Sequence, residues 1–177
     1  QLYPDVNVKL LYKRDYHRLL AKYGFGPLAQ ADVRGIERVL ISTDQLQKRV
    51  AELGRQISED YAGTRPVLVG VLKGVVCFMA DLMRNISLPL SVEVMAISPY
   101  EGDRAGVRIT KDLDRDIEDA HVLMVEDIVD TGMTLNYLIH YLSMRRPASL
   151  RVCALLDKRA RRLVEVPLKY VGFEVPD

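Results

Sequence analysis

Hydrophobic residues after position 39 follow two periods, one helical and one typical of buried strands. The helical period begins after Ser42 and Gln45, which fit a capping box, and it predicts an amphipathic helix that ends near Gly63. Its apolar stripe consists of Leu46, Val50, Leu53 and Ile57. Apolar runs typical of strands buried on both faces of a sheet occupy residues 66–72, 122–125 and 150–156, and a fourth strand is expected over 168–173.

Shorter signals lie between these segments. A strand is expected over 92–96, where apolar and other residues alternate, and a short returning strand over 107–109. Helices are expected over 74–83 and 133–144. Strands that alternate with helices predict an α/β fold, with a mostly parallel twisted sheet and helices on both faces. Ligands of such sheets bind beyond the carboxyl ends of the strands, so the loops that follow the strands are the candidate site.

Two segments depart from this pattern. Residues 10–23 could form a helix, and the rest of the segment up to residue 38 has no clear period. We expect residues 1–38 to be an N-terminal extension of unknown role, followed by a domain over residues 39–177. Residues 98–106 are polar and contain one proline and two glycines, which is typical of a loop. We expect this segment to be a mobile lid loop between two strands.

Composition and charge limit the classes of partner and the cellular location that we expect. The chain has 177 residues and a formal net charge of +1, so no field of one sign indicates a nucleic-acid or membrane partner. No apolar run approaches the roughly 20 residues that span a bilayer, and no signal pattern opens the chain, so a cytoplasmic protein is expected. Cys77 and Cys153 each lie in an apolar run and are expected to be buried thiols. The three histidines are scattered, without metal-ligand spacing.

The segment with the most chemical content is 122–134. Glu126 and Asp127 follow the expected end of a buried strand, Asp130 comes three residues later, and Thr131-Gly132-Met133-Thr134 opens a helix. Carboxylates at this edge can accept hydrogen bonds from sugar hydroxyls or hold Mg²⁺. A helix N-terminus with a glycine and two threonines can wrap a phosphate. The alternative is that Asp130 or Thr131 caps the helix and that Glu126 and Asp127 are solvated loop acids.

This segment resembles the signature with which type I phosphoribosyltransferases bind phosphoribosyl pyrophosphate. Leu72, Lys73 and Gly74 stand where the hypoxanthine-guanine branch has its pyrophosphate loop, in which the peptide bond before the lysine can be cis. Residues 155–158 and 170–177 resemble the purine-binding segments of that branch. The resemblance implies transfer of ribose 5-phosphate from phosphoribosyl pyrophosphate to N9 of a 6-oxopurine, namely hypoxanthine, guanine or xanthine.

The resemblance also implies roles at the phosphoribosyl site. Glu126 and Asp127 would bind the ribose hydroxyls and Mg²⁺, and Asp177 would bind a second Mg²⁺ on pyrophosphate. The loop over 130–134 would hold the 5-phosphate through backbone amides. Asp130 would also accept or donate a proton near N7 of the purine.

For the purine itself, the resemblance implies three further contacts. Lys158 would donate a hydrogen bond to O6, Tyr170 would stack on the ring, and the Val171 backbone would contact the base edge near C2. Without the resemblance, Lys158 would be a surface residue and Tyr170 a core residue of a strand. The family's homodimers and homotetramers imply a similar assembly here.

Two departures from the family stand out. Pro99 and Tyr100 replace the usual Ser-Tyr at the start of the lid, which is also short. Family members usually continue beyond position 177 through a tail with an arginine that contacts pyrophosphate, so we expect either an incomplete chain or a weakened activity. A catalytically weak relative with the same fold therefore remains an alternative. A regulatory RNA-binding relative is a second alternative, but the neutral net charge argues weakly against it and Lys158 with Tyr170 argues more strongly for a purine.

Overall fold

The computed structural model describes residues 39–99 and 107–176 of the chain. The chain divides into two units, Gln1–Ser42 and Thr43–Asp177, and the second contains every helix and strand described below. The expected extension over 1–38, the body of the lid and Asp177 lie outside the described residues.

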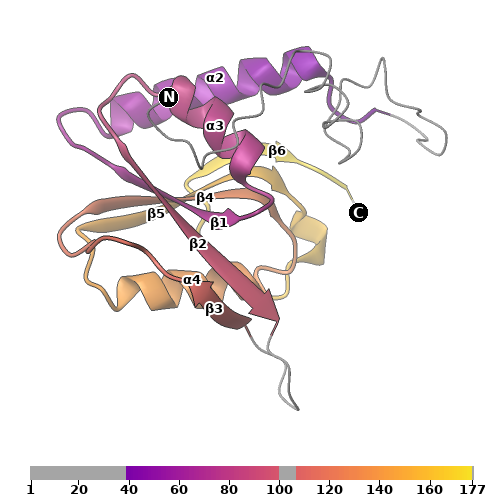
Figure 1. Cartoon of the computed structure of the whole chain (residues 1–177). Helices are drawn as coiled ribbons and strands as arrows, with labels where there is room; N and C mark the ends of the chain where they lie inside the picture. Colours follow the sequence, from indigo (N-terminus) through magenta and orange to yellow (C-terminus); the bar gives the residue numbers. More distant parts are fainter. Residues whose placement is uncertain (1–38, 100–106, 177) are drawn as a thin grey trace, which may run out of the picture. The chain divides into compact units, whose positions relative to one another are not determined.

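Within the described residues, six strands form one sheet in the order β3-β2-β1-β4-β5-β6 (Figure 1). All neighbouring strands run parallel except β2 and β3, which are antiparallel. The strand order reverses between β1 and β4, and such a switch point is where open α/β sheets bind ligands. The strands are β1 (Val67–Leu72), β2 (Ser91–Pro99), β3 (Val107–Lys111), β4 (His121–Val129), β5 (Ser149–Asp157) and β6 (Tyr170–Glu174).

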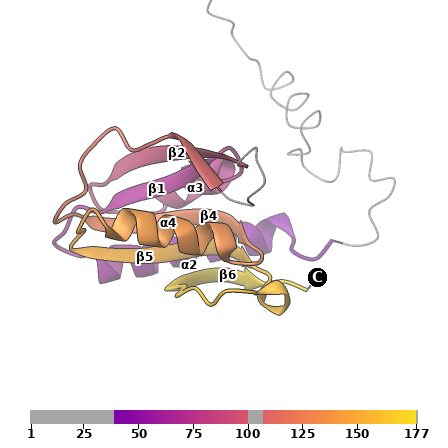
Figure 2. The ribbon, with the colours of Figure 1, turned by 90° about the horizontal axis from the view of Figure 1, so that it is seen from below.

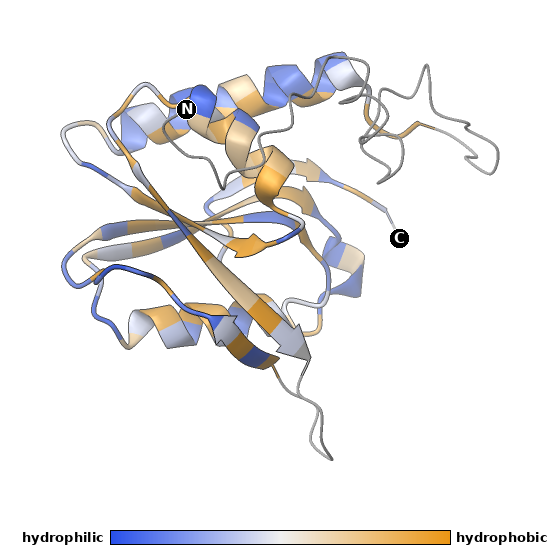
Figure 3. Cartoon of the chain, viewed as in Figure 1, coloured by the Kyte–Doolittle hydropathy of each residue, from blue (hydrophilic) through white to orange (hydrophobic). Residues whose placement is uncertain are grey.

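Helices cover both faces of the sheet, as the sequence predicts. Helices α2 (Thr43–Asp60) and α3 (Val76–Arg84) lie on one face, and α4 (Met133–Ser143) lies on the other (Figure 2). A hydrophobic core lies on each face of the sheet, and alternate residues of the central strands pack into one core or the other. In β4, for example, Leu123 packs toward α2 and α3 whereas Met124 packs toward α4. Figure 3 shows hydrophobic residues along the strands and a mixture of hydrophilic and hydrophobic residues on α2.

The structure corrects several details of the sequence prediction. Strand β4 continues to Val129 instead of ending at Val125, and a short 3-10 helix, η1 (Arg159–Arg161), follows β5 where none was predicted. Cys153 is buried as expected, but Cys77 is exposed because it lies on the outer side of α3. Among the described residues, no helix has both the length and the hydrophobicity needed to cross a membrane.

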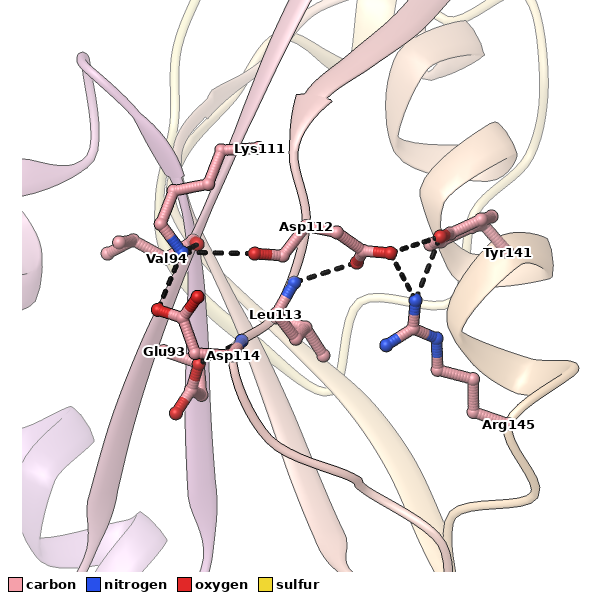
Figure 4. A network of polar contacts seen from close by, with 8 residues as sticks. All are labelled: Glu93, Val94, Lys111, Asp112, Leu113, Asp114, Tyr141 and Arg145. Atoms are coloured by element: carbon pink, nitrogen blue, oxygen red, sulfur yellow. Dashed lines mark hydrogen bonds and ion pairs between the residues drawn. The ribbon is translucent and has the colours of Figure 1, made fainter.

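A polar network ties the end of β3 to α4 (Figure 4). The Asp112 carboxylate accepts hydrogen bonds from the Tyr141 hydroxyl and the Arg145 guanidinium, and its other oxygen accepts one from the Leu113 amide at 2.7 Å. On the other side, Lys111 Nζ donates to the Val94 carbonyl oxygen at 3.2 Å. The network therefore fixes the base of the β2–β3 hairpin to the layer that covers the sheet.

Candidate functional site

The candidate site lies where the carboxyl ends of β1, β4 and β5 meet. These strands are adjacent and parallel, so the turn after β1, the acidic end of β4 and the segment after β5 share one edge of the sheet. The Lys158 amide donates to the Val129 carbonyl oxygen at 2.9 Å, which joins the ends of β5 and β4. The structure thus brings Lys73, Glu126 and Lys158 to the same edge.

Glu126 and Asp127 lie within β4 and not in a loop after it, which corrects the sequence prediction. Because side chains alternate along a strand, the two carboxylates lie on opposite faces of the sheet. Glu126 lines a pocket together with Leu135 of α4. Asp127 lies against Gly74, in the turn that leads into α3.

The Glu126 carboxyl is half-buried and electrostatically strained when it ionises. Burial raises the pKa of Glu126 to about 8, and the negative charge of Asp127 adds to the effect. A cation, or hydrogen-bond donors such as sugar hydroxyls, would favour the ionised form of this carboxyl. The site is therefore suited to a ligand that supplies positive charge or hydrogen-bond donors to Glu126. Without such a ligand the Glu126 carboxyl favours its neutral form.

The turn after β1 makes a close approach that requires a glycine. A Cβ atom on Gly74 would lie 2.2 Å from Asp127 Oδ2, well inside contact distance. The peptide bond between Leu72 and Lys73 is cis. Lys73 and Gly74 are exposed, so the backbone of this turn is open to a ligand beside Asp127.

The loop between β4 and α4 has a backbone suited to an anion. Gly132 is the N-cap residue of α4, with φ of 81°, and no side chain caps the helix at this residue. The Asn136 amide donates to the Gly132 carbonyl oxygen at 2.8 Å, and this bond starts the helix. The first turn of a helix leaves amide donors without intrahelical partners, and these attract anions.

The structure contradicts the alternative in which Asp130 is a simple helix cap, because Asp130 lies two residues before the N-cap position. Thr131 makes only one long contact of that kind, since its Oγ1 accepts a hydrogen bond from the Met133 amide at 3.4 Å. The Thr131 carbonyl oxygen accepts bonds from the amides of Leu163 and Val164. Backbone contacts, and not a cap, therefore hold this loop.

A pocket of about 180 Å³ opens over this loop. Its walls come from the end of β4, the loop and the first turn of α4. The lining residues are Glu126, Ile128, Val129, Asp130, Thr131, Gly132, Thr134 and Leu135. The pocket thus combines two carboxylates with the amides and hydroxyls of a helix start, which matches a polyhydroxylated phosphate ester.

One carboxylate oxygen of Asp130 is buried beside Arg161. Arg161 Nε lies 3.2 Å from Asp130 Oδ1 and forms an ion pair with it. This contact is an ion pair and not a hydrogen bond, so Oδ1 is buried without a hydrogen-bond partner among the described residues. Buried acceptors are normally satisfied, and Asp130 lines the pocket. Because the residue also lines the pocket, a ligand there can donate a proton or a hydrogen bond to the Asp130 carboxylate.

The basic residues that follow Lys158 were not predicted from the sequence to belong to the site. Arg162 forms a buried ion pair with Asp157, and its chain also packs beside Gly132. The signal was present, since four of the five residues from Lys158 to Arg162 are basic. The segment therefore both supports the phosphate loop and supplies positive charge at the edge that holds the acids.

Two predicted residues are not brought to this site. The Tyr170 ring is only 4% exposed and lies in the core under α2, where its hydroxyl donates to Asp60 at 2.8 Å. Tyr170 pairs with Cys153, which lies four residues, or about 13 Å, before the end of β5. The Val171 carbonyl oxygen accepts a bond from Arg49 of α2 at 2.7 Å. Neither residue therefore forms part of the site.

Three other predictions concern the lid, Asp177 and the metal site. Pro99 is the last residue of β2, while Tyr100 and Asp177 lie outside the described residues. Within residues 39–99 and 107–176, no three histidine, cysteine or acidic side chains come together as a metal site. The carboxylates present still fit Mg²⁺, which proteins usually bind through one or two carboxylates together with substrate phosphates.

Comparison with known proteins agrees with this geometry. Residues 42–177 match the model of a phosphoribosyl transferase domain. The chain is 51% identical over 145 residues to hypoxanthine phosphoribosyltransferase of Haemophilus influenzae, covering 78% of this chain and 81% of that protein. It is 48% identical over 151 residues to hypoxanthine-guanine phosphoribosyltransferase of Mycobacterium avium, covering 80% and 74%.

The fold matches solved structures as well. The structure of hypoxanthine phosphoribosyltransferase from Trypanosoma cruzi, in complex with the product IMP, aligns with a TM-score of 0.76. The two chains are 39% identical, and the alignment covers 80% of this chain and 81% of that chain.

Proposed function

The chain belongs to the phosphoribosyltransferase family, and from that premise we propose that it transfers ribose 5-phosphate from phosphoribosyl pyrophosphate to N9 of a 6-oxopurine. One observation carries the proposal: a single pocket is lined by Glu126 and Asp130 and by Thr131, Gly132 and Thr134 at the helix start. A sugar phosphate needs acceptors for its hydroxyls and donors for its phosphate, and this pocket has both. The hypoxanthine and hypoxanthine-guanine enzymes among the relatives support a 6-oxopurine as the acceptor.

The 5-phosphate would bind at the start of α4. Gly132 adopts a φ of 81° and lies close against the Val164 carbonyl oxygen, so a glycine is required to shape this loop. Thr131 and Thr134, which carry hydroxyls, line the same pocket. Amides fixed in a folded loop need no reorganisation as the reaction proceeds, so they position the sugar without an entropic cost at that moment. This binding holds the ribose C1 atom in one place relative to the acids of β4.

The ribose hydroxyls would donate hydrogen bonds to Glu126 and Asp127. Mg²⁺, when bound by these carboxylates and the substrate phosphates, would offset the negative charge that grows on pyrophosphate. The backbone of Leu72, Lys73 and Gly74 would bind pyrophosphate beside Asp127. Negative charge at Glu126 and Asp127 would also stabilise a ribose ring that becomes positively charged as its bond to pyrophosphate breaks.

The purine would lie between Asp130 and Lys158. The Asp130 carboxylate, which lines the pocket, would accept a proton near N7, and the Lys158 ammonium would donate to O6. A base without an oxygen at that position would leave Lys158 unsatisfied, which favours 6-oxopurines over adenine. A cytoplasmic location and a homodimeric or homotetrameric assembly complete the proposal.

An absorbance assay tests this function. The full chain is mixed with phosphoribosyl pyrophosphate, Mg²⁺ and one of four bases: hypoxanthine, guanine, xanthine or uracil. We expect consumption of hypoxanthine and guanine, none of uracil, and loss of activity when a chelator removes Mg²⁺. Consumption of no 6-oxopurine, with phosphoribosyl pyrophosphate still bound in a calorimeter, would favour the catalytically weak relative. Absence of both would contradict the proposed site.

A further inference from the structure

The segment that follows β5, residues 158–164, is bonded at both ends to the end of β4 and to the phosphate loop, residues 130–134. At the start of the segment, the Lys158 amide donates to the Val129 carbonyl oxygen at 2.9 Å. At its end, the amides of Leu163 and Val164 donate to the Thr131 carbonyl oxygen at 2.9 Å and 3.1 Å. The segment and the phosphate loop are therefore joined by backbone hydrogen bonds on either side of η1.

The 3-10 helix η1 makes this segment a tight turn. The Arg161 amide donates to the Lys158 carbonyl oxygen at 3.0 Å, and the Arg162 amide donates to the Arg159 carbonyl oxygen at 3.1 Å. The backbone of Lys158 is therefore held on both sides, through its amide and through its carbonyl oxygen. Because only one such turn separates Lys158 from Arg162, a shift of Arg162 also displaces Lys158.

Arg162 lies at the contact between this segment and the start of α4. A Cβ atom on Gly132 would lie 2.9 Å from Arg162 Cδ and 2.5 Å from the Val164 carbonyl oxygen. The aliphatic part of the Arg162 side chain therefore packs directly against the N-cap residue of α4. That residue lines the pocket in which we place the 5-phosphate. The position of Arg162 thus limits the positions that the phosphate loop can adopt.

The guanidinium of Arg162 is anchored to Asp157. The two side chains form an ion pair and are only 6% and 7% exposed. Asp157 is the last residue of β5, directly before Lys158, and is paired in register with Val129 of β4. A buried ion pair by itself seldom stabilises a fold more than an apolar pair of similar size does. Stability alone therefore does not account for a charged pair at this place.

We propose that Arg162 is a positioning residue that holds the phosphate loop and Lys158 in one fixed geometry. The inference rests on the proposed function, in which the loop binds the 5-phosphate and Lys158 binds O6 of the purine. Arg162 is buried and is not among the residues that line the pocket, so it acts through Gly132 and Lys158 and not by touching a substrate. Because a displacement of about 1 Å in a site can cost about 100-fold, loss of Arg162 weakens the binding of both substrates.

Steady-state kinetics of the full chain with phosphoribosyl pyrophosphate, Mg²⁺ and hypoxanthine test the inference. The double variant Asp157→Asn with Arg162→Ala removes the side chain beside Gly132 and leaves neither charge buried alone. We expect the KM for phosphoribosyl pyrophosphate and the KM for hypoxanthine each to rise at least about tenfold. Asp157→Asn alone removes only the anchor, so both KM values should rise less, by about fivefold. If a thermal melt shows that the double variant is unfolded, the single variant decides.

Two controls separate positioning from stability. Arg162→Lys keeps a carbon chain beside Gly132 and a positive charge opposite Asp157, so both KM values should stay within about twofold of the parent values. Ile57→Ala opens a cavity in the core on the opposite face of the sheet. It should lower the melting temperature and leave both KM values unchanged.

The outcomes distinguish this inference from the proposed function. An active parent chain whose Asp157 and Arg162 variants are folded and keep both parent KM values overturns the inference alone. A rise in only one of the two KM values, or an equal rise in Ile57→Ala, overturns it as well. A parent chain that consumes no 6-oxopurine and binds no phosphoribosyl pyrophosphate contradicts the proposed function itself, and the inference with it.

Discussion

Gly74 and Asp127 touch across the switch point of the sheet: a Cβ atom on Gly74 would lie 2.2 Å from Asp127 Oδ2. Because the obstructing atom ends a short side chain, Gly74→Ala should rotate the Asp127 carboxylate and not unfold the protein. We expect a free energy of unfolding within about 1 kcal/mol of the parent chain. The KM for phosphoribosyl pyrophosphate should rise at least tenfold, since a displaced carboxylate no longer fits ribose and Mg²⁺. Steady-state kinetics and urea unfolding measure both.

Gly63→Ala is the matched control for this prediction. Gly63 has a φ of 77° and no atom within 4 Å of its missing Cβ, so alanine there strains the backbone but touches nothing. It should lower stability by about 1 kcal/mol and leave KM unchanged. If Gly74→Ala retained the parent KM, the contact with Asp127 would have no part in binding.

The regular part of the fold was predictable because local patterns and packing agree there. The apolar run at 66–72 and the stripe from Leu46 to Ile57 each specify one element, and both are found. The end of β4 was not predictable in the same way. Glu126 and Asp127 interrupt the apolar pattern, yet the ladder with β5 continues through the pair of Val129 and Asp157. Backbone pairing with a neighbour thus overrides the polarity of individual side chains.

The site was predictable only in part for a similar reason. The acids and the phosphate loop are contiguous in sequence, so one motif contains them. Asp157 and Arg162 form a pair that is visible only once η1 turns the chain back, since an acid and a base five residues apart have no fixed geometry in a sequence. Tyr170 was misplaced because an aromatic residue at a strand start fits either a purine or a core. Its burial under α2 decides between them.

The Asp112 network predicts a pH dependence of stability. Burial opposes ionisation of Asp112, but hydrogen bonds from Tyr141, the Leu113 amide and Arg145 outweigh it, so the pKa of Asp112 is lowered. The ionised carboxylate therefore stabilises the fold above pH about 4, and this contribution is lost as the pH falls through the folded-state pKa. Asp112→Asn should cost about 1 kcal/mol at pH 7, a modest value because the side chain is partly exposed.

Urea unfolding between pH 7 and pH 3 measures this effect. The difference in stability between the parent chain and Asp112→Asn should shrink as the pH falls below about 4. Asp114→Asn is the control, because Asp114 pairs with Lys111 at the surface with its side chain 78% exposed. It should change stability by no more than about 0.5 kcal/mol. A constant difference for Asp112→Asn at all pH values would contradict the role of its charge.

The ion pair of Asp157 and Arg162 predicts a large, non-additive effect on stability. Both side chains are almost fully buried, and Arg162 Nε already lacks a hydrogen-bond partner among the described residues. Arg162→Met leaves the Asp157 charge buried and uncompensated, which should cost about 3–5 kcal/mol. The double variant Asp157→Leu with Arg162→Met should cost less than Arg162→Met alone.

A double-mutant cycle in urea measures the coupling. The exposed pair of Arg55 and Glu59, whose side chains are 65% and 61% exposed, is the comparison. Its coupling should stay near 0.5 kcal/mol, as is typical of surface pairs (about 0.2–1 kcal/mol). Additive costs at Asp157 and Arg162 would show that burial of these two charges is not the reason for their effect.

The last prediction concerns Asp130 and separates chemistry from structure. Asp130→Asn keeps the shape of the side chain and a hydrogen-bonding oxygen, but it removes the negative charge and most of the basicity. If Asp130 accepts or donates the proton near N7, kcat should fall by roughly 10²–10⁴-fold, the usual range for a general acid or base. The KM for phosphoribosyl pyrophosphate should change much less, because the loss is felt in the transition state.

A purely structural role makes a different prediction. Asp130 forms an ion pair with Arg161 at 3.2 Å, so its carboxylate could act only by holding η1 in place. In that case Arg161→Gln, which breaks the same pair and keeps the carboxylate, should lower kcat as much as Asp130→Asn does. A proton-transfer role predicts instead that Arg161→Gln retains kcat within about tenfold, well short of the loss expected for a general acid or base. Kinetics with saturating hypoxanthine and a thermal melt of both variants distinguish the two, because equal losses of kcat would remove Asp130 from the chemistry.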